Sequence, residues 1–236
     1  MYTAKNGMVA SSDELASNSG RDILKKGGNA VDASIATAFT LSVVLQGSCG
    51  VAGEAMMSIY LERGRETVFI DACGTAPLDA KQDMFIVDSG KGLTPFTQHQ
   101  KVVNSENMVG PKAATVPGQV AGLYEAHEKF GCLEWETLLE PAIKIAEKGF
   151  EVKRYQAEMI KSFLETKQMQ PEIEKIYLKK GNPSTYFRKG NPPKHLAFYP
   201  DYRGDTVIQN YLSKTLKNIS KNGPDDFYNG EIAQKI

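Results

Sequence analysis

The side chains that could act as nucleophiles or metal ligands are few in this 236-residue sequence, and they stand far apart. Its three cysteines, Cys49, Cys73 and Cys132, form neither a C-x-x-C pair nor a disulfide framework. No HExxH motif or cysteine–histidine cluster with the spacing of a metal site occurs. We therefore expect reduced thiols, no bound metal and no other cofactor.

No serine or histidine stands in a recognised catalytic pattern. Residues 47–50 (GSCG) lack the G-x-S-x-G spacing of a nucleophile elbow. His127 falls at helical spacing among apolar residues, which favours a core histidine over a catalytic base. His99 and His195 lie in expected loops with no motif around them. The residues alone therefore predict no complete active site and no catalytic residue in this chain.

The small-residue loop 46–55 (QGSCGVAGEA) carries three glycines. A phosphate cradle is one interpretation, but the loop contains no G-x-G-x-x-G and no Lys-Ser/Thr follows it. Glycine also permits close approach of two backbones. We expect this loop to pack a helix end tightly against a strand, and not to bind a cofactor.

The element that must position these loops is a buried helix over residues 29–44. Apolar or small residues fall on every face of it, and a helix without a polar side is a buried helix. Its one internal charge, Asp32, lies in the first turn, where a carboxylate caps free N–H groups and meets the positive end of the helix dipole. We interpret Asp32 as part of the helix start and not as a catalytic acid.

The remaining elements follow from periodicity, caps and breakers. Before the buried helix we expect a short strand over 7–12, a cap at Ser12 or Asp13, and a helix over 14–26. After it we expect a hairpin, an irregular loop over 79–112 and several helices. The expected ranges are strands 56–62, 66–72 and 112–116, helices 119–130, 134–148 and 205–221, a charged helical pattern over 151–180 split near Pro171, and opening helical turns over 231–236.

The composition is typical of a globular protein and gives no sign of a highly charged partner. Lysine plus arginine and aspartate plus glutamate both number 28, so the net charge is +0 and no nucleic-acid or acidic-lipid partner is indicated. Hydrophobic residues make up 41%, enough for the core of a single unit over 1–236. The first residues lack the apolar core of a secretory signal and no segment is apolar enough to span a bilayer, so we expect a cytoplasmic protein.

A series of sequence blocks resembles the large-subunit portion of the γ-glutamyltransferase (γ-glutamyltranspeptidase) family. In the family's order, the blocks are GMVASSDELAS, ILKKGGNAVDASIATAFTLSVV, SCGVAGEAMMSIY, FIDACGTAP, AATVPGQVAGLYEAHEKFG, LEWETLLEPAIKIAEKGFEV and DDFYNGEIAQKI. The resemblance implies an α+β fold, the αββα layered sandwich of N-terminal-nucleophile hydrolases, which is incomplete without the small-subunit segment.

The same resemblance implies a catalyst outside this chain. In that family a precursor cuts itself ahead of a threonine, and the new N-terminal threonine attacks a γ-glutamyl amide with its own α-amine as general base. The expected partner is therefore a small-subunit segment that carries this threonine, and the expected substrate is a small-molecule amide whose acyl group passes to water or an amine. The alternative is a non-catalytic remnant or scaffold subunit, so whether this chain is an enzyme stays open.

Two departures from the family's pattern bear on substrate binding. The family's D-x-R-E-T-A-P reads DACGTAP here. Cys73 therefore replaces the arginine that binds the substrate α-carboxylate in the family, and Gly74 replaces the glutamate. The resemblance thus places substrate binding at Cys73, Gly74 and Thr75. The family's glycine run is also interrupted, by Ala52 and Glu54, as in the branch that resembles cephalosporin acylases. Cys73 has no histidine or lysine near it in sequence, which favours a packing residue over a reactive thiol.

Overall fold

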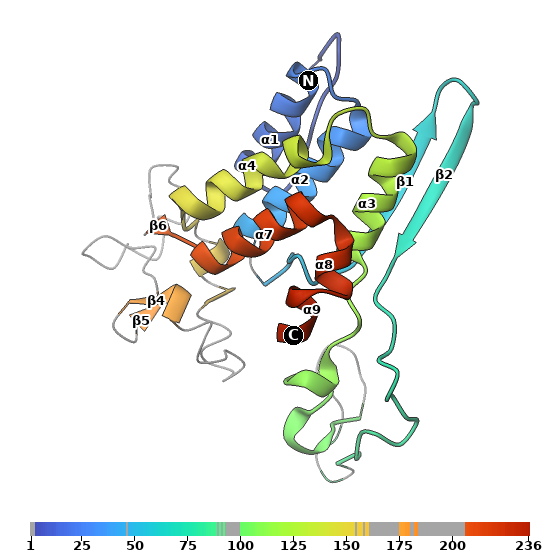
Figure 1. The fold of residues 1–236 in the computed structure, drawn as a ribbon. Helices are drawn as coiled ribbons and strands as arrows, with labels where there is room; N and C mark the ends of the chain where they lie inside the picture. Colours follow the sequence, from blue (N-terminus) through green and yellow to red (C-terminus); the bar gives the residue numbers. More distant parts are fainter. Residues whose placement is uncertain are drawn as a thin grey trace.

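The computed structural model describes residues 3–45, 47–88, 90, 92, 100–153, 155–157, 159–160, 175–179, 182–183 and 206–236. The predictions for His99, His195 and Pro171, and for most of 151–180, lie outside these residues. Figure 1 shows the helices as one packed group with a hairpin at its side. The elements are α1 (Glu14–Lys25), α2 (Ala30–Val44), β1 (Ala55–Leu61), β2 (Glu66–Ala72), α3 (Gln119–Phe130), α4 (Trp135–Lys148), β3 (Phe150–Glu151), β4 (Leu178–Lys179), β5 (Asn182–Pro183), β6 (Thr206–Val207), α7 (Asn210–Asn222), α8 (Pro224–Tyr228) and α9 (Glu231–Lys235).

Asp13 caps the start of helix α1: its carboxylate accepts a hydrogen bond from the Leu15 N–H at 2.8 Å. Of the two predicted caps, Asp13 is therefore the correct one. The helix packs closely on α2 because Gly20 has no side chain. A Cβ at Gly20 would lie 2.3 Å from Thr37 Oγ1 and 2.9 Å from the Ala33 carbonyl oxygen.

Helix α2 lies at the centre of the helical group, in contact with α1, α3 and α4. Asn29 and Asp32 form a capping box at its start: the Asn29 side chain accepts from the N–H groups of Val31 and Asp32, and Asp32 accepts from the Asn29 N–H at 3.0 Å. This confirms both the buried helix and the predicted role of Asp32. Its buried residues are Val31, Asp32, Ala33, Ile35, Ala36, Thr37, Phe39, Thr40, Ser42, Val43 and Val44.

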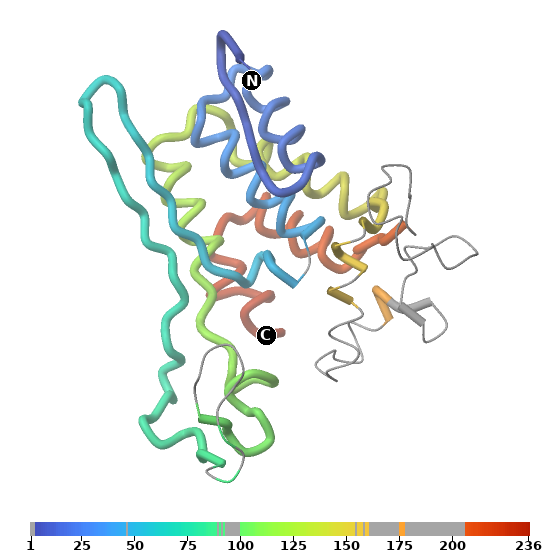
Figure 2. The backbone as a smooth tube through the Cα atoms, turned by 180° about the vertical axis from the view of Figure 1, so that it is seen from behind, coloured from blue at the N-terminus to red at the C-terminus, as the bar shows by residue number. Residues whose placement is uncertain are grey.

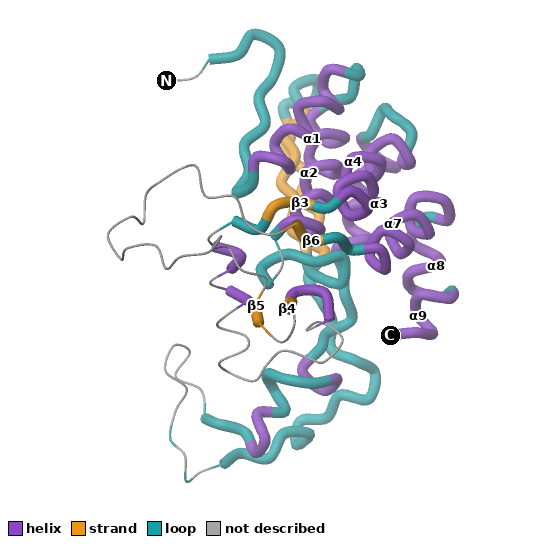
Figure 3. Tube along the Cα trace, turned by 90° about the vertical axis from the view of Figure 1, so that its left-hand side faces the viewer, coloured by secondary structure: helices purple, strands orange, loops and turns teal. Residues whose placement is uncertain are grey.

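The helical group is joined through the single tryptophan of the chain. Helix α2 packs on α4, and α4 packs on α7. Figure 3 shows α4 between the ends of the other two helices, in the same packed group. Trp135, at the start of α4, donates its indole N–H to the Ile219 carbonyl of α7 at 3.1 Å. Its ring meets Phe39 of α2 and Tyr124 of α3 edge-on, with centroids 5.5 and 5.0 Å apart. Trp135 therefore contacts residues of three other helices.

Strands β1 and β2 form an antiparallel hairpin, in register from Ala55 opposite Ala72 to Leu61 opposite Glu66. Helix α3 contacts both strands, and Figure 2 shows the hairpin along the flank of the helical group. The predicted second strand is confirmed, and the first lies one residue earlier than predicted. Ile59 and Ile70 are buried on one face of this hairpin.

The predicted strand over 7–12 is wrong. These residues have no strand partner within the described part of the chain, and the Met8 side chain is 67% exposed. An apolar run becomes a strand only where a neighbouring strand satisfies its backbone N–H and C=O groups. Figure 2 shows this N-terminal segment passing over the helices as an extended chain.

The predicted helix over 205–221 is wrong at its start. Thr206 and Val207 pair with Glu151 and Phe150 as strands β6 and β3, and α7 begins only at Asn210. Val207 is buried in this strand pair. An apolar side chain at this position fits a buried helix as well as a buried strand, so the sequence did not distinguish the two. The predicted helices over 119–130 and 134–148 are confirmed within one residue, as are the turns after 231.

Two short elements also differ from expectation. The predicted strand over 112–116 is wrong, because Pro111–Ala113 is a 3-10 turn and only Val116 pairs, with Thr75. Helix α8 was not predicted: Pro224 occupies its first turn, where the missing N–H of proline carries no cost. None of the helices in the described ranges is both long enough and apolar enough to cross a membrane.

Candidate functional site

Cys73, Gly74 and Thr75 follow directly on β2, where the chain leaves the hairpin. Thr75 and Val116 form an isolated antiparallel bridge: the Val116 N–H donates to the Thr75 carbonyl at 2.8 Å, and the Thr75 N–H donates to the Val116 carbonyl at 3.3 Å. Figures 1 and 2 show these two segments running side by side below the hairpin. The loop that leaves β2 is thus tied to the segment that enters α3.

At Gly74, other residues fill the space that a side chain would occupy. A Cβ there would lie 2.3 Å from Thr115 Oγ1 and 2.6 Å from Glu54 Oε1. Real Cβ atoms do not approach other heavy atoms so closely, so a glutamate at this position, as in the family's pattern, would displace both groups. The structure therefore brings Glu54 of the glycine loop against the predicted site residues.

The N-terminus of α3 holds three of these segments together. The Gly53 carbonyl accepts from the N–H groups of Gly118 and Gln119 at 3.1 and 3.0 Å. A Cβ at Gly118 would lie 2.2 Å from the Ala72 carbonyl oxygen, so glycine permits this contact between α3 and β2. The Gln119 amide donates to the Ser42 hydroxyl of α2 at 2.8 Å. The glycine loop is thus bonded to the start of α3, but its glycines do not pack a helix end against a strand as predicted: a Cβ at Gly50 would meet no atom within 4 Å, and one at Gly53 would meet the Gly50 carbonyl of the same loop at 2.8 Å.

The charges around Cys73 are negative. The Cys73 N–H donates to Asp71 Oδ1 at 3.0 Å, and this bond lowers the pKa of Asp71. The pKa of the Cys73 thiol is raised, first by its hydrogen bond to Asp71, with burial and repulsion by the carboxylates of Asp71 and Glu54 adding to it. A thiol with a raised pKa is not a thiolate nucleophile at neutral pH. This agrees with the expectation that Cys73 is not a reactive thiol.

Sequence reasoning did not find Tyr228, which supports this region from the far end of the chain. Its hydroxyl donates to the Pro117 carbonyl at 2.8 Å and accepts from the Ala121 N–H at 3.2 Å. It therefore fixes the turn that enters α3, next to Gly118. The block DDFYNGEIAQKI was the available signal, but nothing local in it shows that a tyrosine there meets a proline 111 residues away.

Replacing Tyr228 by phenylalanine tests this support. The change keeps the ring and removes the hydroxyl, which leaves the Ala121 N–H without its partner. We expect the free energy of unfolding to fall by about 1 kcal/mol, measured by urea titration. Tyr211→Phe is the matched control, because Tyr211 is 79% exposed and its change should cost less than about 0.5 kcal/mol. Equal effects of the two variants would contradict the assigned role.

The other candidate residues take part in packing. His127 Nε2 lies 2.7 Å from the Leu133 carbonyl and its ring lies 5.3 Å from that of Trp135, so His127 has a hydrogen-bond partner and packs on the core as predicted, although it is only partly buried. All three cysteines are free thiols, and burial raises the pKa of Cys49. In the described ranges no group of three His, Cys, Asp or Glu side chains could hold a metal ion.

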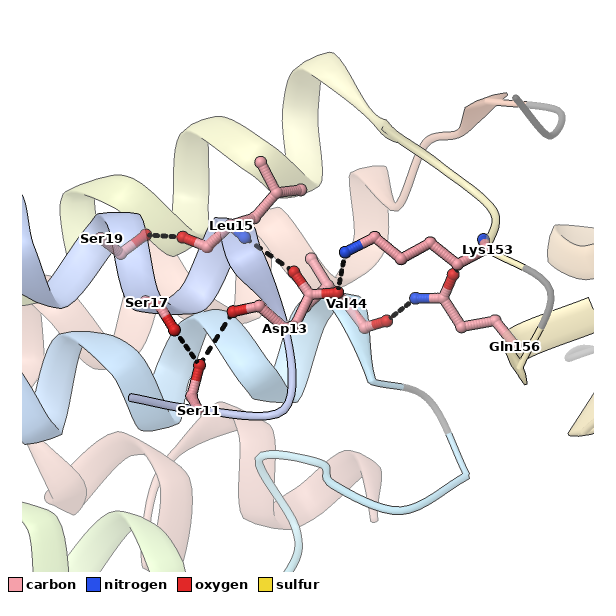
Figure 4. Close-up of polar contacts among 8 residues, drawn as sticks. All are labelled: Ser11, Asp13, Leu15, Ser17, Ser19, Val44, Lys153 and Gln156. Carbon is pink, nitrogen blue, oxygen red and sulfur yellow. Dashed lines mark hydrogen bonds and ion pairs between the residues drawn. The ribbon is translucent and has the colours of Figure 1, made fainter. Parts of the chain in front are cut away.

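A second polar cluster lies at the start of α1, away from Cys73 (Figure 4). Lys153 Nζ pairs with Asp13 Oδ2 at 2.6 Å, and the Gln156 side chain accepts from the Lys153 N–H at 2.5 Å. The Gln156 amide also donates to the Val44 carbonyl, and the Ser11 hydroxyl donates to the Asp13 carbonyl at 2.8 Å. These groups bind one another, so the cluster anchors Lys153 and Gln156 to the start of α1 and the end of α2.

Comparison with solved structures defines the class of this fold. Gamma-glutamyltranspeptidase of Helicobacter pylori superposes with a TM-score of 0.81 at 33% identity, over 100% of this chain and 60% of that chain. Cephalosporin acylase of Bacillus halodurans superposes with a TM-score of 0.76 at 27% identity, over 98% of this chain and 39% of that chain. The helical group and its hairpin are thus part of an α+β N-terminal-nucleophile hydrolase fold, which confirms the predicted fold class.

Sequence comparison gives the family. The sequence model described as Gamma-glutamyltranspeptidase matches residues 16–236, and the chain belongs to that family. The glutathione hydrolase proenzyme of Bacillus subtilis (strain 168) is 37% identical over 232 residues, which are 98% of this chain. The chain spans only 35% of that relative's length.

Proposed function

We propose that this chain is the large-subunit part of a γ-glutamyltransferase-like amidohydrolase or acyltransferase. It cleaves a γ-glutamyl or related amide together with a partner segment that carries the nucleophilic threonine. The observation that carries this proposal is the family match over residues 16–236. The chain contributes the helical layer, the hairpin and the loops around Cys73, and the partner contributes the nucleophile.

The reaction is an acyl transfer in two steps. The threonine hydroxyl attacks the amide carbonyl while the free α-amine of the same threonine takes the hydroxyl proton. That proton passes to the leaving nitrogen, the C–N bond breaks, and the acyl group remains as an ester on the threonine. Water or an acceptor amine then attacks the ester and frees the threonine hydroxyl again. Residues 73–75 would hold the acyl group beside the attacked carbonyl.

The outer face of the hairpin is evidence for the proposed partner. Met56, Tyr60 and Phe69 point away from the helices and are 66, 59 and 59% exposed. No strand within the described residues extends the pair β1–β2 at either edge. A two-stranded sheet with large exposed apolar side chains gains stability when another layer covers it. We propose that the threonine-bearing segment packs there.

Turnover by the assembled protein tests the proposal. This chain is co-expressed with a threonine-led segment encoded in the same genome, and the complex is assayed with γ-glutamyl and related acyl p-nitroanilides. We expect release of p-nitroaniline by the complex and none after the leading threonine is replaced by alanine. A complex that forms but cleaves none of these amides would contradict the proposed function.

A non-catalytic scaffold subunit is the second candidate. It is favoured by Cys73, which cannot grip an α-carboxylate as the arginine of the family's pattern does. Cleavage of a γ-glutamyl anilide by the complex, lost with an active-site inhibitor, would exclude this candidate.

Replacing Cys73 by arginine in the complete enzyme should restore a grip on the α-carboxylate. A charge-assisted hydrogen bond of this kind improves binding of a γ-glutamyl donor by an amount on the order of 1–3 kcal/mol. The measurement is the KM for γ-glutamyl p-nitroanilide, with Cys73→Ser as the neutral control that should change little. No gain with arginine would mean that another cation already fills this role.

A further inference from the structure

Three buried glutamines from distant segments bond the last turn of α2. The last carbonyl groups of a helix have no partner within the helix, so other segments must supply the donors. The side-chain amides that bond this turn are those of Gln119, which donates to the Ser42 hydroxyl, Gln156, which donates to the Val44 carbonyl, and Gln209, which donates to the Val43 carbonyl. The end of α2 is therefore fixed by side chains and not only by its own backbone.

Gln119 bonds the glycine loop as well as α2. Its amide donates to the Ser42 hydroxyl at 2.8 Å, and its backbone N–H donates to the Gly53 carbonyl at 3.0 Å. The backbone N–H of Gln209, by contrast, donates to the Ala146 carbonyl of α4 at 2.9 Å. Gln119 thus joins the chain before the glycine loop to the end of that loop, whereas Gln209 joins α2 to α4.

The residue before Gln119 lies against the chain that leaves β2. A Cβ at Gly118 would lie 2.2 Å from the Ala72 carbonyl oxygen and 2.9 Å from the Cys73 carbonyl oxygen. These are backbone atoms, which cannot move aside as the end of a flexible side chain can. The start of α3 therefore contacts both the glycine loop and the segment 73–75 to which the proposed function assigns the acyl group.

We propose that Gln119 is a positioning residue of this site. Its hydrogen bond to Ser42 fixes the start of α3 on α2, and the start of α3 in turn fixes the glycine loop and residues 73–75 relative to each other. The inference rests on the proposed function, because residues 73–75 hold an acyl group only if the assembled protein cleaves an amide.

Gln119→Met in the complete enzyme tests this role, because methionine keeps an unbranched side chain and removes the amide. The measurement is KM and kcat for the acyl p-nitroanilide that the unaltered complex cleaves fastest. KM should rise about tenfold, since the residues that bind the donor lose their fixed arrangement. A variant that was only less stable would contain less active enzyme, so its apparent kcat would fall and its KM would not change.

Gln209→Met is the matched control, because it removes a similarly buried amide from the same turn of α2. Its KM should stay within about twofold of that of the unaltered complex. Ser42→Ala removes the acceptor of the Gln119 amide and is a second, smaller change at the same bond. It should raise KM as Gln119→Met does, and the double variant should show no further rise, because both changes remove one interaction.

An unchanged KM in Gln119→Met and Ser42→Ala, an equal rise in Gln209→Met, or a further rise in the double variant would overturn the inference while the proposed amide cleavage still stands. If the unaltered complex cleaves no amide, the proposed function itself is wrong.

Discussion

Trp135→Ala should destabilise the protein by about 3–5 kcal/mol, the range for removal of a large buried aromatic side chain. Trp135 is 7% exposed, and its ring lies between Phe39 and Tyr124. Alanine would leave a cavity where α2, α3, α4 and α7 meet. It would also leave the Ile219 carbonyl without the indole N–H that it now accepts at 3.1 Å.

The measurement is urea unfolding followed by far-UV circular dichroism, since the variant removes the only tryptophan of the chain and with it the usual fluorescence signal. Trp135→Phe is the control: it keeps a ring in the core and loses the indole donor, so we expect about 1–2 kcal/mol. An alanine variant no less stable than the phenylalanine variant would show that the ring does not fill the core as described.

Asp32→Ala should lower the free energy of unfolding by about 2–4 kcal/mol, because the carboxylate accepts hydrogen bonds from two separate segments. It accepts the Asn29 N–H at the start of α2, and it accepts the Cys132 N–H at 3.2 Å and the Cys132 thiol at 2.9 Å. Asp32 is fully buried, so alanine would remove the acceptor of these donors from inside the helical group. The loss therefore combines a helix cap with a contact between residues a hundred positions apart.

Asp32→Asn separates these contributions, since asparagine keeps one acceptor oxygen of the same shape. We expect it to lose roughly half of what alanine loses, measured in the same urea titration. Alkylation of Cys132 should become faster in Asp32→Ala, because the hydrogen bond to Asp32 is the main cause of the raised pKa of that thiol. A fully stable alanine variant would contradict the assigned role of Asp32.

Elements with a strong local pattern could be predicted from the sequence. Helix α2 has apolar residues on every face and an asparagine–aspartate start, and the strands of the hairpin flank an obvious turn. The errors concern elements defined by a distant partner. Val207 joins a strand because Phe150 lies opposite it, and residues 7–12 lack a partner strand among the described residues. No local pattern contains that information.

The candidate site was located only in part. The resemblance marked Cys73, Gly74 and Thr75 as substrate-binding residues, which stays a prediction, and it marked Glu54 as a departure from the family's glycine run. These three residues follow the second strand, which ends at Ala72. The resemblance did not show that Glu54 and Thr115 close the space at Gly74, or that Tyr228 fixes the turn before α3. These contacts join residues 20 to 111 positions apart, so they follow from the fold and not from the spacing of the sequence.

We propose above that this chain shapes the site of an acyl-transfer enzyme and that the nucleophile comes from a partner segment. Mass spectrometry of the assembled complex, quenched during turnover of a donor amide, tests it most directly. We predict an acyl group on the leading threonine of the partner and none on this chain. An acyl group on Cys73, or on any other residue of this chain, would contradict the account.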